Sequence, residues 1–330
     1  MKKILQYLFE HKTLDRGQAR DVLTRIARGD FNESELAAFI TVYLMRSVTI
    51  EELQGFRDAL LELCVRVDLN GHETIDIVGT GGDGKNTFNI STLACFIVAG
   101  AGHKVAKHGN YGATSISGAS NVMEQLGYRH KNDAGALRRE VEEAGICFLH
   151  APLFHPALKT VGPIRKNLGV RTFFNMLGPM VNPAFPATQL VGVYNLEMAR
   201  IYNYLLQQTE GRFTIIHSLD GYDEISLTGD TKVITNNGEK IMTPEELGKR
   251  MVNATDIYGG NTVEEAAKLF VTILRGDGSW AQNAVVMANA AMALYASGGF
   301  ASYEAAYSAA VESLESGKAY KALEKLIALQ

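Results

Sequence analysis

The chain has 330 residues, 46% of them hydrophobic, which is enough to bury the core of one large domain or of a large and a small one. Its 32 basic and 36 acidic residues leave a formal net charge of -4, so no sequence-wide positive field attracts nucleic acid or an anionic membrane. No apolar run approaches ~18 residues, the first residues do not fit a signal peptide, and the three cysteines form no Cys-x-x-Cys pair. We therefore expect a soluble cytoplasmic protein with reduced thiols, and neither nucleic acid nor a membrane as its partner.

The first 65 residues carry only helical patterns. Asn32 stands as an N-cap with Glu35 three residues later, and Thr49 and Glu52 repeat this capping box. Between the two boxes, apolar side chains recur every three or four positions across residues 36–44. That spacing builds a helical face that must be buried, so this part predicts a small helical domain.

From Thr74 onward, short β-type runs alternate with glycines and helical stretches, which is typical of α/β architecture. The strand candidates, separated by lengths that suit crossover helices, are residues 75–78, 104–106, 147–149 and 213–216. In the C-terminal third, further strands are expected at 226–228 and 232–235, and a helix start at 243–246. Because these elements differ in direction, we expect a mixed sheet.

A glycine-rich segment, residues 79–92, leads from the first expected strand into a helix. Backbone N–H groups and the positive end of the helix then converge where an anion can bind. Gly79, Gly81 and Gly84 fit the G-x-G-x-x-G spacing of dinucleotide-binding folds. Those folds need an acidic residue about 20 positions later to bind the ribose, but Lys107 and His108 occupy that place here. The segment also begins like a P-loop, yet Asn86 occupies the place of the magnesium-binding hydroxyl. A tight turn without a ligand is the remaining interpretation.

A second polar cluster, residues 107–110, leaves the next expected strand and is followed by a segment rich in glycine and hydroxyl groups. If the two strands are parallel neighbours, both loops emerge at the carboxyl edge of the sheet, where ligands bind in such folds. A lysine and a histidine at a strand end are often only a solvated surface. Their place beside the glycine segment favours a shared anion site instead.

These two segments, together with residues 154–179, closely resemble anthranilate phosphoribosyltransferases in order and spacing across nearly the whole chain. The resemblance implies a nucleoside phosphorylase-like phosphoribosyltransferase fold of the α/β class. It consists of a small helical domain, residues 1–70 with a contribution from about 163–183, and a large α/β domain, residues 71–330, with a central mixed sheet. It also implies a homodimer, a role in tryptophan biosynthesis, Mg2+ as cofactor, and anthranilate and phosphoribosyl pyrophosphate as substrates.

The resemblance further assigns ligands to residues. It implies that phosphoribosyl pyrophosphate is held by Gly79, Gly82, Asp83, Thr87, Asn89, Ile90, Ser91, Thr92, Lys107, His108, Gly109, Asn110, Thr114, Ser115 and the position of Ala119. It implies contacts to anthranilate from Gly79, Asn110 and Arg165, and to magnesium from Ser91, Asp223 and Glu224.

The chemistry of the side chains agrees with these roles. Magnesium takes oxygen ligands, which the adjacent Asp223 and Glu224 supply, although such a pair can also be a solvated acidic turn. The guanidinium fork of Arg165 matches the carboxylate of anthranilate, although it could simply decorate a helix. Phe173 and Phe174 are predicted to be core residues. No residue is assigned as an acid or base, because the aromatic amine is already neutral at pH 7.

The loop that follows Asn110 departs from the usual family pattern at Tyr111, Ala119 and Asn121, where a cation, a hydroxyl and an acid are exchanged. Ala119 cannot supply the phosphate hydrogen bond that the resemblance implies there. Two alternative functions stay open at this point. One is a pyrimidine nucleoside phosphorylase, which should lack the Arg165 segment, and the other is a non-catalytic nucleic-acid-binding relative, which would need a basic surface.

Overall fold

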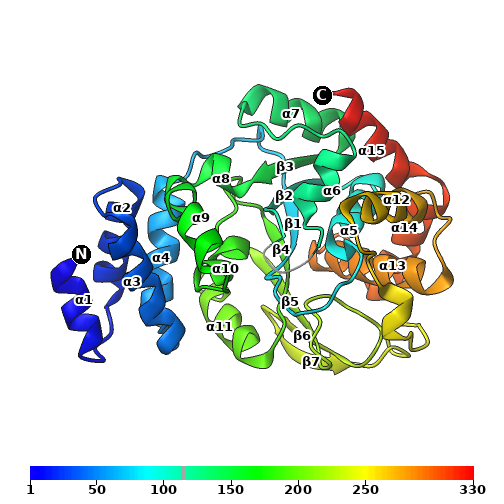
Figure 1. Ribbon diagram of the computed structural model, residues 1–330. Coiled ribbons are helices and arrows are strands. Elements are labelled where there is room, and N and C mark those ends of the chain that lie inside the picture. The colour runs from blue at the N-terminus through cyan, green and yellow to red at the C-terminus, as the bar shows by residue number, and fades with distance from the viewer. Residues whose placement is uncertain (113–115) are drawn as a thin grey trace. The chain divides into compact units, whose positions relative to one another are not determined.

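The computed structural model describes residues 1–112 and 116–330, which form two compact units (Figure 1). The helical unit contains Met1–Val67 and His150–Phe185, and the α/β unit contains Asp68–Leu149 and Pro186–Gln330. The predicted fold class, a small helical domain with a larger α/β domain, is confirmed. The segment that returns to the helical unit is longer than the expected 163–183. Within the described residues, no helix is long and apolar enough to cross a membrane.

The helical unit is built from helices whose starts are encoded locally. Its elements are α1 (Lys2–Phe9), α2 (Arg16–Ala27), α3 (Glu33–Met45), α4 (Ile50–Leu63), α8 (Ala151–Phe154), α9 (Pro156–Leu168), α10 (Phe174–Leu177) and the 3-10 helix η1 (Gly178–Met180). Asn32 and Glu35 form the capping box of α3, and Thr49 and Glu52 form that of α4. Both predicted helix starts are therefore confirmed.

An aromatic cluster forms the core of this unit. Phe39, Tyr43 and Phe56 come from α3 and α4, and Phe173 packs among them with ring centroids 4.7 Å from Phe56 and 4.8 Å from Tyr43. Phe173 also stacks on Phe174 at 4.3 Å, and both are buried. The prediction that these two phenylalanines belong to the core is confirmed.

The α/β unit is organised around one seven-stranded sheet, in the order β3-β2-β1-β4-β5-β6-β7. Its strands are β1 (Thr74–Gly79), β2 (Lys104–Gly109), β3 (Ile146–His150), β4 (Thr188–Gly192), β5 (Arg212–Ser218), β6 (Thr231–Thr235) and β7 (Gly238–Met242). Strand β1 runs parallel to β2 and β4, and β4 runs parallel to β5. Strands β6 and β7 are antiparallel, so the predicted mixed sheet is confirmed. Strands β4 and β7 were not predicted from the sequence.

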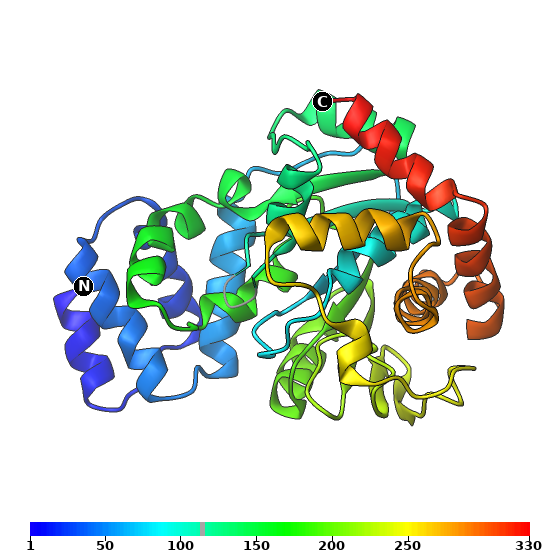
Figure 2. The ribbon, with the colours of Figure 1, turned by 45° about the vertical axis from the view of Figure 1, so that its right-hand side comes forward.

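Helices cover the sheet on both faces (Figures 1 and 2). They are α5 (Ile90–Gly100), α6 (Ala119–Gln125), α7 (Ala134–Ala144), α11 (Leu196–Leu206), α12 (Val263–Leu274), α13 (Trp280–Ala296), α14 (Tyr303–Glu315), α15 (Lys318–Ala328) and the 3-10 helix η2 (Ala254–Ile257). Ile77, Leu190 and Ile216 join α5 and α13 in one core cluster. Val191 and Ile215 alternate with them along the strands and face the other side, where α11 packs on β5.

Two expected elements of the C-terminal third are wrong. Residues 226–228 form no strand, because Leu227 has a left-handed backbone with φ of 58° and Ser226 bonds locally to Ser218 at 3.1 Å. At residues 243–246, Thr243 and Glu246 do exchange capping-box hydrogen bonds. The segment continues only as turns, and Gly248, with φ of 71°, ends it.

Candidate functional site

Two glycines end the neighbouring strands β1 and β4, and an acidic turn packs directly against them. Gly79 and Gly192 are paired across the two strands. A Cβ atom on Gly79 would overlap the carboxylate of Asp223, and one on Gly192 would overlap the carbonyl oxygen of Asp223. The glycines therefore allow Asp223 to reach the carboxyl edge of the sheet, the edge at which α/β folds bind ligands.

Three carboxylates meet at this edge. Asp83, Asp223 and Glu224 each offer an oxygen, and these oxygens lie within 4.8 Å of one another. Burial and the neighbouring Asp223 raise the pKa of Asp83 to about 6 and raise the pKa of Glu224 well above its usual range. The Oε2 atom of Glu224 is buried and has no hydrogen-bond partner among the residues that the structure describes. Since like charges this close repel one another, the cluster fits a divalent cation with oxygen ligands.

Side chains from β5 and α13 fix the acidic turn in place. Ser218 Oγ donates to the carbonyl oxygen of Glu224 at 2.7 Å. The buried Asn289 accepts from the N–H of Ile225 at 3.0 Å and donates to its carbonyl oxygen at 2.8 Å. The turn therefore presents its carboxylates from a rigid frame, as a preorganised cation site requires.

The glycine segment forms a loop between β1 and α5 that is tied to the acidic turn. The N–H of Gly81 donates to Oδ2 of Asp223 at 2.7 Å, and the N–H of Lys85 donates to Oδ1 of Asp83 at 2.9 Å. Lys85 Nζ lies 4.5 Å from the ring centre of Tyr222. Residues 80–89, called the donor loop below, thus bring backbone N–H groups and carboxylates to one place.

The donor loop leads into the N-terminus of α5, where the first N–H groups of a helix lack intrahelical partners. Ser91 is partly exposed there, whereas Ile90 and Thr92 are buried. The N–H of Ile90 donates to the carbonyl oxygen of Phe88 at 2.6 Å. Asn89 donates to the carbonyl oxygen of Ser117 at 3.0 Å and so joins the donor loop to the segment after β2.

The predicted cluster, residues 107–110, begins inside β2, which runs three residues further than the expected 104–106, and two of its side chains are buried. Lys107 is 2% exposed, and its Nζ donates to the carbonyl oxygen of Ile77 in β1 at 2.6 Å. The ammonium of Lys107 also partly offsets the raised pKa of Glu224. His108 is 2% exposed, so it is not a solvated surface group. Its backbone N–H donates to Oδ1 of the buried Asp76 at 3.2 Å. Lys107 therefore supplies buried positive charge near the acidic cluster.

The segment after Asn110 carries the departures from the family pattern. Asn121 Oδ1 accepts from the N–H groups of Gly112 and Gly118 at 3.2 and 3.0 Å, so the amide that replaces the acid still closes this loop. Tyr111 OH donates to Glu124 at 2.7 Å. Ala119 begins α6 and is partly exposed, close to Gly109. Thr114 and Ser115, expected to hold phosphoribosyl pyrophosphate, lie outside the described residues.

Arg165 belongs to the helical unit, in the last turn of α9. Its Nη2 donates to Oδ1 of Asn175 at 3.0 Å, and the same oxygen accepts from the N–H of Thr172 at 3.1 Å. Burial lowers the pKa of Arg165. Its Nε has no hydrogen-bond partner among the described residues. The guanidinium is thus oriented by Asn175 and keeps capacity to donate to an acidic group.

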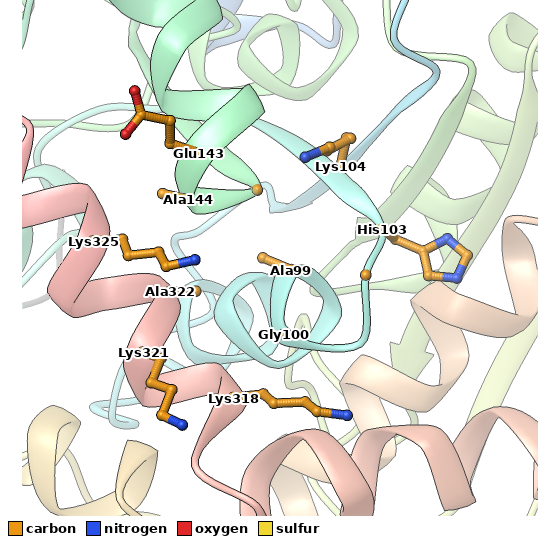
Figure 3. Close-up of a pocket in the computed structure, with 12 residues that line it drawn as sticks. Ala99, Gly100, His103, Lys104, Glu143, Ala144, Lys318, Lys321, Ala322 and Lys325 are labelled. Carbon is orange, nitrogen blue, oxygen red and sulfur yellow. The ribbon is translucent and has the colours of Figure 1, made fainter.

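A lysine-lined pocket lies at the opposite end of the strands (Figure 3). Lys104 opens β2 there and donates to the carbonyl oxygens of Val141 and Glu142, at 2.8 and 3.2 Å, near the end of α7. Lys318 pairs with Glu312 at 2.6 Å. Cations are favourable at helix C-termini, where carbonyl groups lack partners. Lys104 therefore stabilises the end of α7, whereas the exposed pair of Lys318 and Glu312 contributes little, and the pocket is not assigned to a substrate.

Several contacts of this site were not predicted from the sequence. Asp83 was expected to contact the donor, but its carboxylate stands with the two expected magnesium ligands. Ser218, Asn289 and Gly192 support the acidic turn from distant parts of the chain. The Val191-Gly192 end of a β-type run is the one local signal that could have pointed to β4. The other contacts have no local signature.

Family models match nearly the whole chain. The glycosyl transferase family, a/b domain, matches residues 71–320, and the glycosyl transferase family, helical bundle domain, matches residues 2–64. An anthranilate phosphoribosyltransferase of Flavobacterium johnsoniae is 60% identical over 326 residues, which cover 99% of this chain and 98% of that protein. One of Bacteroides fragilis is 56% identical over 329 residues, which cover 100% of this chain and 99% of that protein.

Solved structures agree in fold. The anthranilate phosphoribosyltransferase from Thermus thermophilus has a TM-score of 0.90 at 32% identity and covers 98% of each chain. The one from Saccharomyces cerevisiae, in complex with phosphoribosyl pyrophosphate and magnesium, has a TM-score of 0.87 at 28% identity, covering 96% of this chain and 93% of that one.

Proposed function

The chain belongs to the anthranilate phosphoribosyltransferases, and we propose that the donor loop and the acidic turn of its α/β unit are the donor and metal site of their reaction. The enzyme transfers the phosphoribosyl group of phosphoribosyl pyrophosphate to the amino group of anthranilate, a step of tryptophan biosynthesis. The products are N-(5-phosphoribosyl)anthranilate and pyrophosphate. The observation that carries the site assignment is the meeting of three carboxylates with the N–H groups of the donor loop.

Bond cleavage between C1 and pyrophosphate builds positive charge on the ribose and negative charge on the leaving group. Asp223 and Glu224, with the Asp83 carboxylate beside them, would hold Mg2+, which would supply charge compensation for that leaving group. The resemblance implies Ser91 as a further ligand. The N–H groups of the donor loop and of the first turn of α5 add fixed donors for the phosphates. Lys107 contributes a buried positive charge near the carboxylates.

The donor contacts proposed for this chain follow the resemblance residue by residue. They come from the donor loop and α5, from the end of β2 with Asn110 after it, and from Thr114, Ser115 and the position of Ala119. For the helical unit, the proposal is that Arg165 binds the carboxylate of anthranilate through its guanidinium fork. For the α/β unit, the resemblance implies contacts to anthranilate from Gly79 and Asn110. The neutral aromatic amine attacks C1 directly and loses its proton late, so no general base is assigned.

A pyrimidine nucleoside phosphorylase and a non-catalytic nucleic-acid-binding relative were the alternatives. The Arg165 segment and the relatives at 60 and 56% identity favour the anthranilate reaction over the former. The net charge of -4 and the carboxylate cluster argue against the latter.

The test of the function uses the purified protein and the fluorescence of anthranilate. Anthranilate fluorescence should fall only when phosphoribosyl pyrophosphate and Mg2+ are both present. Reactions with thymidine and free phosphate should release no base. Release of thymine without consumption of anthranilate would reject the proposal.

We also propose that the enzyme is a cytoplasmic homodimer that pairs through its helical unit. Large apolar side chains are exposed on two of its helices: Phe9 is 62% exposed in α1, and Met45 is 84% exposed at the end of α3. Exposed apolar groups on a soluble enzyme are commonly covered by a second protein surface. Sedimentation should give a dimer for the native chain and a monomer for a variant with Phe9→Glu and Met45→Glu. A native monomer at micromolar concentration would contradict the proposal.

A further inference from the structure

A segment far along the chain runs beside the donor loop in the α/β unit (Figure 2). Residues 257–260 begin at the last residue of η2 and lie antiparallel to residues 86–88. Two backbone hydrogen bonds join the two segments: the N–H of Phe88 donates to the carbonyl oxygen of Ile257 at 3.2 Å, and the N–H of Gly259 donates to that of Asn86 at 2.8 Å. Together they make Thr87 and Tyr258 an antiparallel β-bridge. Residues 257–260, called the strap below, thus hold the middle of the donor loop.

Asn86 adds a side-chain bond to these backbone contacts. Its Nδ2 donates to the carbonyl oxygen of Gly260 at 2.7 Å, from a partly buried position. In a P-loop, the residue in this place would bind magnesium through a hydroxyl. Here the amide instead faces the protein scaffold, which makes Asn86 a candidate for positioning rather than for contact with the donor.

Gly259 permits a very close approach of the two backbones. A Cβ atom at this position would overlap the carbonyl oxygen of Thr87, and would lie 2.6 Å from its carbonyl carbon and 2.7 Å from the nitrogen of Phe88. All three atoms belong to the backbone, so no side-chain rotation can make room. Any side chain at Gly259 must therefore shift the donor loop or the strap and disturb the contact between them.

The strap is itself fixed at both ends. Ile257 is 1% exposed and belongs to the core cluster of the α/β unit. On the other side, the N–H of Asn261 donates to Glu265 in the first turn of α12 at 2.7 Å, and Thr262 caps that helix. A loop that contains three glycines with positive φ is intrinsically permissive, so a fixed neighbour can restrict its conformations.

We propose that the strap positions the donor loop for phosphoribosyl pyrophosphate, and that Asn86 and Gly259 are its positioning residues. Holding N–H groups in the geometry of the bound phosphates lowers the ordering cost of binding and aligns them with the leaving group. This inference rests on the proposed role of the donor loop as the donor site. It predicts that damage to the strap weakens the binding of phosphoribosyl pyrophosphate more than the binding of anthranilate.

The first test compares Asn86→Ala with Asn283→Ala. Asn283 makes the same kind of bond, from its amide to the carbonyl oxygens of Gly276 and Gly278 at 3.0 and 3.2 Å, in a loop before α13. Both variants should lose similar thermal stability. Only Asn86→Ala should raise the KM for phosphoribosyl pyrophosphate, about tenfold, with the KM for anthranilate within about twofold. Asn86→Gln, which keeps the donating amide, should recover part of the loss.

The second test compares Gly259→Ala with Gly211→Ala, where an added Cβ meets only an ordinary contact at 3.5 Å. Calorimetric titration with phosphoribosyl pyrophosphate and Mg2+, without anthranilate, should show weaker binding for Gly259→Ala by tenfold or more and native binding for Gly211→Ala. Unchanged donor affinity in folded Asn86→Ala and Gly259→Ala would overturn the strap proposal alone. If the native enzyme neither binds the donor nor consumes anthranilate, the proposed function fails instead.

Discussion

Replacement of Arg165 by alanine tests the acceptor site most directly. The guanidinium is oriented by Asn175 at 3.0 Å, and its Nε has no hydrogen-bond partner among the described residues. Truncation therefore removes a positioned cation and leaves the Asn175 amide with one bond fewer. We expect the α9 helix to persist, because Val161 and Ile164 still bury its apolar face.

The size of the effect follows from the bond that is lost. A charge-assisted hydrogen bond contributes about 1.5–3 kcal/mol, which corresponds to about a 10- to 150-fold rise in the KM for anthranilate. The KM for anthranilate of Arg165→Lys should lie between those of the native enzyme and Arg165→Ala, because an ammonium keeps the charge but lacks the planar fork. The KM for phosphoribosyl pyrophosphate should change much less, since the donor carries no carboxylate.

Steady-state kinetics with anthranilate varied at saturating donor measures this effect, and Lys166→Ala serves as the matched control. Lys166 is the next residue of the same helix and is exposed. Its loss should leave both KM values within about twofold of the native enzyme. A native KM for anthranilate in Arg165→Ala would remove Arg165 from the acceptor site.

Three further predictions concern the metal, the donor and stability. Asp223→Asn with Glu224→Gln should leave the fold intact but raise the magnesium requirement and lower turnover; unchanged magnesium titrations would refute the metal site. Ala119→Ser should lower the donor KM several-fold, by a bond worth about 0.5–1.5 kcal/mol, and an equal or higher KM would mean that the loop has been rebuilt. Burial lowers the pKa of His155 from 6.5 to about 4, so protonation favours the unfolded chain. The contribution of neutral His155 to the free energy of unfolding is fully present above pH 6.5, and about 3 kcal/mol is lost as the pH drops toward 4. Urea unfolding at pH 7.5 and 4.5 should show a smaller loss for His155→Gln than for the native chain.

Local patterns predicted much of this protein because their physical causes are local. A capping box needs only four consecutive residues, so Asn32 and Thr49 marked the starts of α3 and α4 correctly. Glycines between an apolar run and a helical run predicted the loop between β1 and α5. The same logic failed at residues 226–228, because Leu227 takes a left-handed backbone that alternation of residue types does not reveal.

The arrangement of the site depends on contacts between residues that are far apart in the sequence. Asp83 meets Asp223 only because β1 and β4 are neighbours in the sheet and end in glycines that admit the acidic turn. The strap contacts Asn86 across more than 170 positions of the sequence. The residue types indicated which chemistry this chain could perform, because glycines, carboxylates and a guanidinium are properties of single residues. Their distances and burial came from packing, because chain folding brings together groups whose positions no short segment specifies.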